Sequence, residues 1–232
     1  NLLIIYFMKK FVVFLNLLLI CSFVFISCVN EKGGYENGHE YVDLGLSVKW
    51  ATCNIGADSA WNGGSYFAWG EVESRQWGDT KMDKYCVEYE FLTKYCTVAK
   101  YGYNGLVDDK IILDAEDDAA TINWGGRWRM PTKEEFEELC DNCTFELQTL
   151  NGEIGYKVIG KNGNSIFLPM PTWIESESVL EGFMKGDYWS SSLFISSPFY
   201  AYRMSLVELE EYSVYLEGMP RHCPTFIRPV CP

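Results

Sequence analysis

Residues 124–139 read Trp124-Gly125-Gly126-Arg127-Trp128-Arg129-Met130-Pro131-Thr132-Lys133-Glu134-Glu135-Phe136-Glu137-Glu138-Leu139. Pro131 ends an extended segment. The Thr132 hydroxyl can then accept a hydrogen bond from the amide of Glu135, while the Glu135 carboxylate reaches back to the Thr132 amide. Glu134 and Glu135 also suit the positive end of a helix dipole. This capping box predicts a helix whose apolar stripe packs on the core through Phe136, Leu139 and Cys140.

Several motifs resemble a known family. Arg129-Met130-Pro131-Thr132 followed by Glu135-Phe136 is similar to a helix-opening motif in the formylglycine-generating-enzyme branch of C-type-lectin-like folds. Four further strings, in the correct order, resemble the fibrobacter major paralogous domain and its relatives among Bacteroidota surface lipoproteins: 41–54, 66–71, 188–192 and 227–230. The resemblance covers nearly the whole mature chain. It implies an α+β, C-type-lectin-like fold, with short antiparallel strands, one or two helices and long irregular loops.

The first residues carry an export pattern. Met8 precedes two lysines and an apolar run that ends at Ile26, as in a signal peptide. Ser27 and Cys28 then resemble a lipoprotein cleavage site, although Phe25 stands where leucine is usual. A transmembrane helix is the alternative, but no cluster of Lys or Arg follows the run.

These features divide the chain into four parts. We interpret residues 1–7 as an upstream extension outside the native protein and residues 8–27 as a lipoprotein signal peptide. Residues 28–40 are expected to be a tether after lipidated Cys28, and residues 41–232 a single domain. Because Val29 is not acidic, the resemblance implies anchoring in the outer membrane, facing the cell surface or the periplasm.

The composition argues against a nucleic-acid partner. The chain has 19 Lys and Arg against 32 Asp and Glu, and cleavage before Cys28 leaves 17 against 32. Such a surface repels phosphates and anionic headgroups. We therefore expect contact with the membrane through the lipid anchor only.

Seven cysteines remain after cleavage, apart from the anchor. An exported chain permits disulfides, and an odd number leaves at least one thiol free or bonded to another chain. The pairings stay open, with Cys86–Cys96 and Cys223–Cys231 as candidate local bridges. Cys140 and Cys143 have the spacing of a zinc or redox pair, but no second such pair accompanies them.

The rest of the domain predicts mostly short strands. One hairpin is clear, with strands at 156–159 and 165–168 around an Asn162-Gly163 turn. Residues 73–114 lack periodicity and predict loops, and residues 114–120 predict a short helix. Further strands are expected at 41–44, 48–51, 66–69, 188–193, 200–206, 212–216 and 226–230.

The late strands interleave aromatic and serine residues, which gives large contact areas and adaptable hydrogen bonds. Trp189 among them reads as a core residue. The side chains of these strands that are expected to face outward predict a ligand face. It consists of Tyr200, Tyr202, Arg203, Tyr212, Tyr215 and Arg221.

Catalytic residues are not predicted. His39 reads as a solvated tether residue, and a His222–Cys223 nucleophilic pair would be abolished by a disulfide at Cys223. The tripeptides of calcium-dependent lectins are absent from the sequence, and a separate calcium loop at Asp114, Glu116, Asp117 and Asp118 is a weak alternative. We expect no cofactor and no metal.

Three hypotheses for function follow. The first is a membrane-anchored, non-enzymatic binding module for a glycan or for a surface or extracellular protein. The second is a structural or adhesin subunit of a surface assembly, favoured if apolar patches pair with another chain. The third is a divergent enzyme with a Cys/His or carboxylate site in a cleft.

Overall fold

Antiparallel sheets dominate the computed structural model, which describes residues 33–174, 183–208 and 214–232. They belong to one compact unit, Gly33–Pro232. Among these described residues, 39% lie in strands and 14% in helices. The expected α+β, C-type-lectin-like class is therefore wrong, because stretches expected to be loops are additional strands and hairpins. Within the described ranges only one helix, α3 (Lys133–Asn142), exceeds two turns.

The predicted extension, signal peptide and lipidated Cys28 lie outside the described residues. Among the helices that are described, none combines the length and apolar character needed to cross a bilayer.

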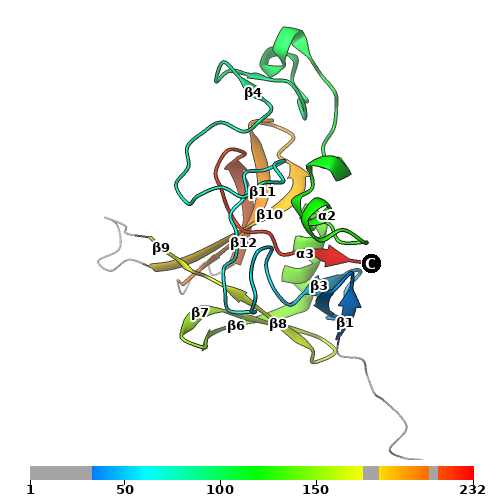
Figure 1. Cartoon of the computed structure of the whole chain (residues 1–232), viewed down its shortest axis with the longest axis vertical. Helices are drawn as coiled ribbons and strands as arrows, with labels where there is room; N and C mark the ends of the chain where they lie inside the picture. The colour runs from blue at the N-terminus through cyan, green and yellow to red at the C-terminus, as the bar shows by residue number, and fades with distance from the viewer. Residues whose placement is uncertain (1–32, 175–182, 209–213) are drawn as a thin grey trace, which may run out of the picture. The chain divides into compact units, whose positions relative to one another are not determined.

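The first sheet joins the two ends of residues 33–232 (Figure 1). It has the order β1-β2-β3-β13, with β1 at Gly33–Glu36, β2 at His39–Val42, β3 at Lys49–Ala51 and β13 at Val230–Cys231. Residues 33–40, the later part of the expected tether at 28–40, lie in the hairpin of β1 and β2. Asn37 and Gly38 both have positive φ, 46° and 87°, and close a two-residue hairpin between β1 and β2.

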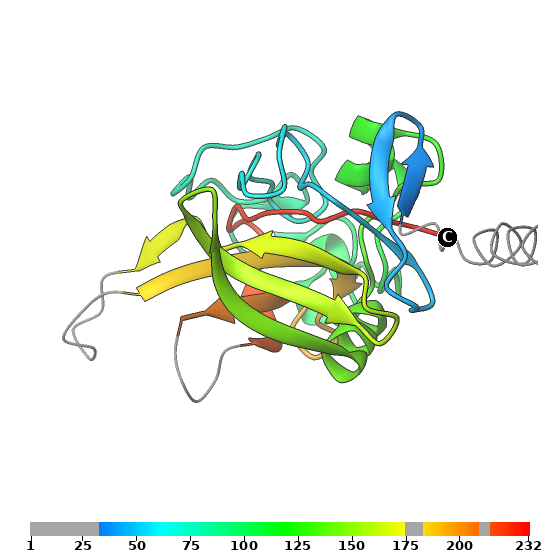
Figure 2. The same cartoon turned by 90° about the horizontal axis from the view of Figure 1, so that it is seen from below.

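The second sheet follows α3 directly and has the order β6-β7-β8 (Figure 2). Its strands are β6 (Cys143–Leu150), β7 (Glu153–Gly160) and β8 (Ser165–Pro169). The predicted hairpin of β7 and β8 is confirmed, although in its turn only Gly163 has positive φ, 83°. Strand β6 was not predicted.

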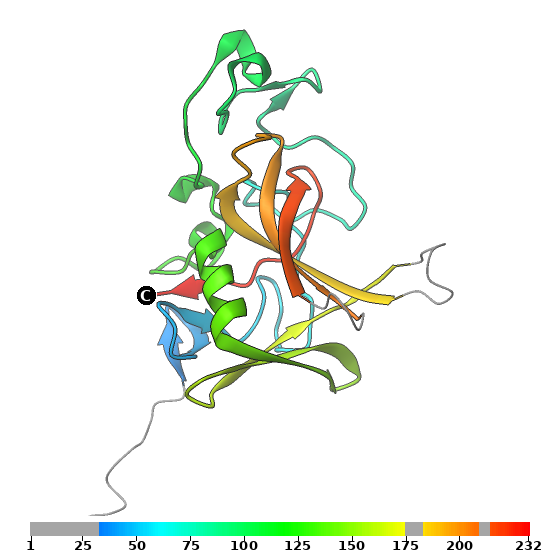
Figure 3. The same ribbon diagram turned by 180° about the vertical axis from the view of Figure 1, so that it is seen from behind.

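The third sheet carries the late strands in the order β12-β11-β10-β9. The strands are β9 (Thr172–Ile174), β10 (Phe183–Leu193), β11 (Tyr200–Val207) and β12 (Val214–Pro220). Helix α3 packs beside β10, β11 and β12 (Figure 3). The three predicted runs of the tail are therefore strands, with shifted ends.

The segment between the first sheet and α3 is largely irregular, as expected for residues 73–114. The strand expected at 66–69 is wrong, since only isolated bridges form there, at Tyr66 and Phe67. The segment contains the two-stranded sheet β4 (Cys86–Val87) and β5 (Phe91–Leu92) and four helical pieces. These are η1 (Ala99–Tyr101), η2 (Tyr103–Gly105), η3 (Ala115–Asp117) and α2 (Ala119–Trp124).

The capping box of α3 is confirmed. Glu135 N donates to Thr132 Oγ1 over 3.3 Å, and Thr132 N donates to Glu135 Oε2 over 2.8 Å. Phe136 and Leu139 are fully buried. The same carboxylate also holds Arg129, whose NH1 lies 2.7 Å from Glu135 Oε2. Glu135 thus serves both as a cap and as an ion-pair partner.

The β1–β2 hairpin packs against the Gly-Gly pair before α3. Gly126 has a φ of 60°, and a Cβ there would lie 2.7 Å from Glu36 Oε1. The His39 ring stacks on Trp124 at 3.8 Å between centroids, and Trp128 Nε1 donates to Glu36 O over 2.6 Å. His39 is therefore packed against the domain rather than solvated in a tether.

The core consists of two clusters of buried apolar side chains. Trp189 is fully buried and its indole Nε1 donates to Phe67 O over 2.9 Å, so its core assignment is confirmed. All seven cysteines of the described residues are free thiols, so the candidate bridges Cys86–Cys96 and Cys223–Cys231 are not formed.

Candidate functional site

The predicted ligand face does not form one surface among its described members. Tyr200 and Tyr202 lie two residues apart on β11 and leave one face of the sheet, whereas Arg203 leaves the opposite face. Tyr200 is 38% exposed, whereas Tyr202 is half-buried against Phe194 at 4.9 Å between ring centroids. Tyr212 lies outside the described residues.

Arg203 is buried inside a charged cluster on the other face. Its guanidinium pairs with Asp187 and Glu217, and Ser205 Oγ donates to Asp187 Oδ1 over 2.8 Å. Tyr215 is half-buried and stands opposite Ser205 in the β11–β12 register. Burial lowers the pKa of Arg203, and the charge of Glu217 opposes this effect only in part. Arg203 is occupied by internal partners.

Arg221 is also buried and paired. Its NH2 lies 3.1 Å from Asp83 Oδ1, and its guanidinium lies 4.9 Å from the centre of the Trp69 ring. Two tyrosine rings, Tyr85 and Tyr95, complete an aromatic enclosure at about 6 Å. Arg221 is fully buried, so it is a core residue rather than part of a ligand face.

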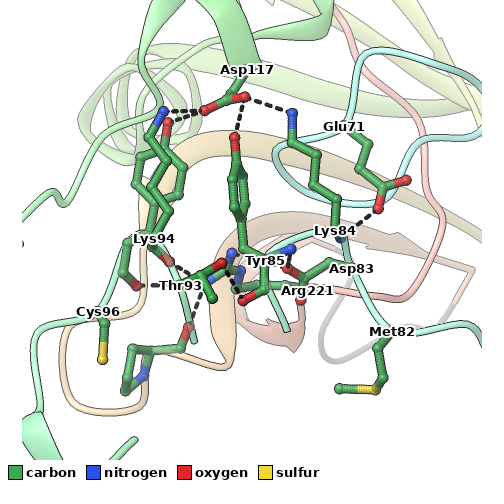
Figure 4. Close-up of polar contacts among 12 residues, drawn as sticks. Glu71, Met82, Asp83, Lys84, Tyr85, Thr93, Lys94, Cys96, Asp117 and Arg221 are labelled. Atoms are coloured by element: carbon green, nitrogen blue, oxygen red, sulfur yellow. Dashed lines mark hydrogen bonds and ion pairs between the residues drawn. The ribbon is translucent and has the colours of Figure 1, made fainter. Parts of the chain in front are cut away.

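Asp117 is the centre of the densest polar network (Figure 4). Its Oδ1 accepts from Lys84 Nζ over 2.6 Å and from the Tyr85 hydroxyl. Its Oδ2 accepts from Lys94 Nζ over 2.7 Å and from the Tyr95 hydroxyl over 2.6 Å. Burial alone would raise the pKa of Asp117, but these four donors outweigh it and lower the pKa.

Three of the four carboxylates of the possible calcium loop surround an ammonium group. Lys94 Nζ lies 2.7 Å from Asp114, 2.9 Å from Glu116 and 2.7 Å from Asp117. The carboxylate oxygens lie within 4.8 Å of one another, a spacing that could hold a cation. Lys94 supplies that positive charge, and the three partners hold its pKa above the ordinary value despite burial. Asp118 instead caps α2 by accepting from Thr121 N.

The cysteines and His222 give little support to the enzyme hypothesis. Burial raises the pKa of Cys223, and it raises the pKa of Cys140 to about 12 and of Cys143 to about 11. Thiols with a raised pKa are mostly protonated at neutral pH, and the protonated form is a poor nucleophile. Neither His222 nor Cys223 lines the pocket described next.

An open pocket of about 610 Å³ lies on the loop after the first sheet, a region for which the sequence predicted no function. One half-buried indole, from Trp61, stands among polar groups and two carboxylates. The other lining residues are Asp58, Ser59, Asn62, Gly63, Glu153 and Pro171.

The loop that carries Trp61 is closed at its base. Ser65 N donates to Ile55 O over 2.9 Å, and buried Asn54 donates from Nδ2 to Gly63 O over 2.9 Å. Asn54 Oδ1 in turn accepts from Arg228 Nε over 2.7 Å. The loop is therefore fixed from beneath by a fully buried arginine.

Arg228 joins three parts of the fold below the pocket. Its NH1 donates to Ala51 O over 3.0 Å and to Thr52 O over 2.9 Å, and its NH2 donates to Phe167 O over 3.0 Å. The end of β3, strand β8 and the pocket loop thus share one guanidinium. This is the five-donor geometry for which arginine is suited.

Tight turns place the opposite wall of the pocket. Asn151 and Gly152 have positive φ, 52° and 92°, as a type I′ turn requires, and they put Glu153 at the start of β7. Gly63 approaches the wall so closely that a Cβ would lie 2.8 Å from Pro171 Cγ. Glycine is therefore needed at that position.

The polar groups of the pocket are oriented within the loop. Asp58 Oδ1 accepts from Ser59 Oγ over 3.1 Å and from Asn62 Nδ2 over 3.4 Å, and Asn62 Oδ1 accepts from Gly64 N over 3.0 Å. Both bonds of Asp58 fall on one oxygen, and within the described residues Oδ2 has no protein partner. A flat apolar ring beside donors and acceptors can bind a ligand with one apolar face and many hydroxyls.

The sequence contained signals for this site. Asn151-Gly152 is the strongest short hairpin signal and would have located Glu153. Asn62-Gly63-Gly64 likewise indicates a turn after Trp61. Arg228, which is far away in the sequence, connects the base of the Trp61 loop to β8, the strand paired with β7.

The chain matches no protein-family model, no curated protein and no solved structure. The resemblance to the fibrobacter major paralogous domain therefore stays a prediction.

Proposed function

We propose that this protein is a membrane-anchored, non-enzymatic binding module that holds a neutral glycan in the Trp61 pocket. The observation that carries the proposal is the single indole among Asp58, Asn62 and Ser59 on a loop closed at its base. A fixed loop loses little conformational entropy on binding, so its contacts contribute to affinity. Sugars offer axial C–H groups to an aromatic face and hydroxyls to the surrounding oxygens and amides.

Charge restricts the class of glycan. Asp58 and Glu153 line the pocket, and the whole chain has a formal net charge of −13. Sulfated or uronic-acid-rich glycans would be repelled by this field. Neutral hexose and pentose polymers would not be.

Replacing Trp61 by alanine is expected to weaken glycan binding at least 30-fold, which is about 2 kcal/mol for a central aromatic contact. The measurement is a glycan array, followed by calorimetry on the hits, with the full chain in detergent. Tyr89→Ala removes an aromatic ring that is 79% exposed elsewhere, so this control should bind like the wild type. Equal binding by the wild type and Trp61→Ala would contradict the proposal.

Salt and product analysis separate the rival ligands and functions. A cationic peptide would also suit two carboxylates and an indole, but its binding would weaken steeply with ionic strength, whereas binding of a neutral glycan would not. Release of shorter sugars from a bound oligosaccharide would indicate hydrolysis by the carboxylates and would contradict a non-enzymatic role.

The anchor has its own test. Replacing Cys28 by alanine is expected to move the protein from the membrane fraction to the soluble fraction, because the acyl chains supply the membrane affinity. Fractionation and immunoblotting measure the distribution, with Cys53→Ala as the matched control. Retention of the Cys28→Ala variant in the membrane fraction would argue against lipid anchoring.

A further inference from the structure

Trp77 is an exposed indole on a tight turn. Its side chain is 55% exposed, although tryptophan is usually largely buried. Asp79 N donates to Gln76 O over 3.2 Å, and Gly78 has a φ of 78°, as the third position of a type II turn requires. Trp77 therefore occupies the second position of this turn.

Arg75 holds the segment on which the turn stands. Its Nε lies 2.7 Å from Glu71 Oε2, and its guanidinium also donates to Lys81 O over 2.6 Å and to Met82 O over 3.0 Å. One side chain thus connects both ends of the turn. The Glu71–Arg75 pair is largely buried, with side-chain exposures of 14% and 12%, so exposed Trp77 is presented from a fixed base.

Aromatic rings connect this turn to the Trp61 pocket. The Trp77 ring packs on Tyr66 at 5.3 Å between centroids, and Tyr66 packs on Phe226 at 4.4 Å. A Cβ on Gly63, which lines the pocket, would lie 3.0 Å from the Phe226 ring. Phe226 is buried, Tyr66 is half-buried and Trp77 is exposed. These three rings therefore form a continuous row from buried Phe226, beside the pocket, to Trp77 at the surface.

We propose that Trp77 is a second stacking subsite for an extended neutral oligosaccharide whose end lies in the Trp61 pocket. This inference rests on the proposed function. It specifies the ligand as a chain of several sugar units, because the row of Tyr66 and Phe226 connects Trp77 to the pocket through two successive ring contacts of 5.3 Å and 4.4 Å. β-1,4-linked glucose, mannose and xylose have equatorial glycosidic bonds, so their chains are extended and present flat C–H faces that two separated rings can stack against.

The test compares ligand lengths in two variants. The probes are β-1,4-linked gluco-, manno- and xylo-oligosaccharides of two and six residues, titrated by calorimetry into the full chain in detergent. We expect Trp77→Ala to weaken binding of the hexamer about ten-fold and to leave binding of the dimer unchanged. Trp61→Ala should weaken both, and Tyr89→Ala should change neither. Circular dichroism checks that each variant is folded.

The outcomes separate this inference from the proposed function. If Trp77→Ala binds the hexamer like the wild type while Trp61→Ala does not, the subsite is wrong and the pocket stands. The same holds if Trp77→Ala weakens the dimer and hexamer equally, since the effect is then independent of length. If the wild type binds none of these oligosaccharides, the subsite is overturned, and the glycan array alone decides the proposed function.

Discussion

Replacing Arg228 by lysine is expected to lower the free energy of unfolding by about 3–5 kcal/mol. Arg228 is fully buried and donates to Asn54 Oδ1 and to three backbone carbonyls. A lysine has three donors on a single nitrogen and cannot reach acceptors that are spread around the edge of a planar guanidinium. At least two acceptors would lose a charged donor, each worth about 1.5–3 kcal/mol.

Urea unfolding followed by tryptophan fluorescence measures this loss. Arg127→Lys is the matched control, because the Arg127 side chain is 62% exposed and water screens its pair with Glu36. The Arg228→Lys variant should also bind glycan less tightly, since Asn54 would no longer be held beneath Gly63. A loss of stability below about 1 kcal/mol would mean that Arg228 is not what fixes the loop.

Replacing Asp117 by asparagine is expected to lower the free energy of unfolding by about 3–5 kcal/mol at pH 7, the range for breaking a buried ion pair. Asparagine presents an amide NH2 to two of the four donors that now converge on the carboxylate. It also leaves Lys84 and Lys94 without their buried partner. Because side-chain exposure is 2% at Asp117 but 39% at Lys84, the greater part of the loss is expected on the Lys94 side.

The effect of Asp117 should depend on pH in a defined direction. Its pKa in the folded protein lies below the ordinary value of 3.8, so the carboxylate stabilises the fold at pH values above 3.8. This contribution disappears as the pH falls toward the folded pKa. The difference between the wild type and Asp117→Asn should therefore be full at pH 7 and shrink below about pH 4.

Unfolding curves between pH 3 and pH 8 measure this difference, with Asp109→Asn as the control. Asp109 is exposed, so its replacement removes the same net charge without disturbing a buried network. A difference that stays constant down to pH 3 would show that the charge of Asp117 is not what stabilises the network.

Local signals in the sequence were sufficient for several elements. The capping box required only Thr132 and Glu135, which are three residues apart, and the β7–β8 hairpin required only its turn and the alternation around it. Capping and turn formation depend on neighbouring residues, so they can be read from a short window. Trp189 was also assigned correctly to the core.

Properties that depend on distant contacts were missed. The pairing of β13 with β3 joins residues about 180 positions apart, and no local pattern encodes it. Arg203 and Arg221 looked like surface residues because arginine is seldom buried without partners. Their partners, Asp187, Glu217 and Asp83, lie on other strands and loops. The fold class was wrong for a related reason, since short motifs carry little information on how strands assemble.

The candidate site was missed because it consists of parts that are separately ordinary. The Trp61 loop and the turn before Glu153 lie about ninety residues apart, and Arg228 fixes the loop from near the end of the chain. The ligand face was predicted on residues 188–216 instead, because these residues are rich in aromatic side chains. In the structure two of those rings, Tyr188 and Trp189, belong to the core.

The β1–β2 hairpin has a mechanical consequence. Gly33 pairs with Val42 at the open end of this hairpin, so a pull on the chain from residue 32 would peel β1 away one residue pair at a time. The separation of β1 from β2 would reach Glu36, where hydrogen bonds from Trp128 and Arg127 hold the strand. These bonds to the Gly-Gly segment before α3 would resist further separation. In a chain anchored as proposed, a pulling force would therefore break contacts at this edge before it acted on the Trp61 pocket.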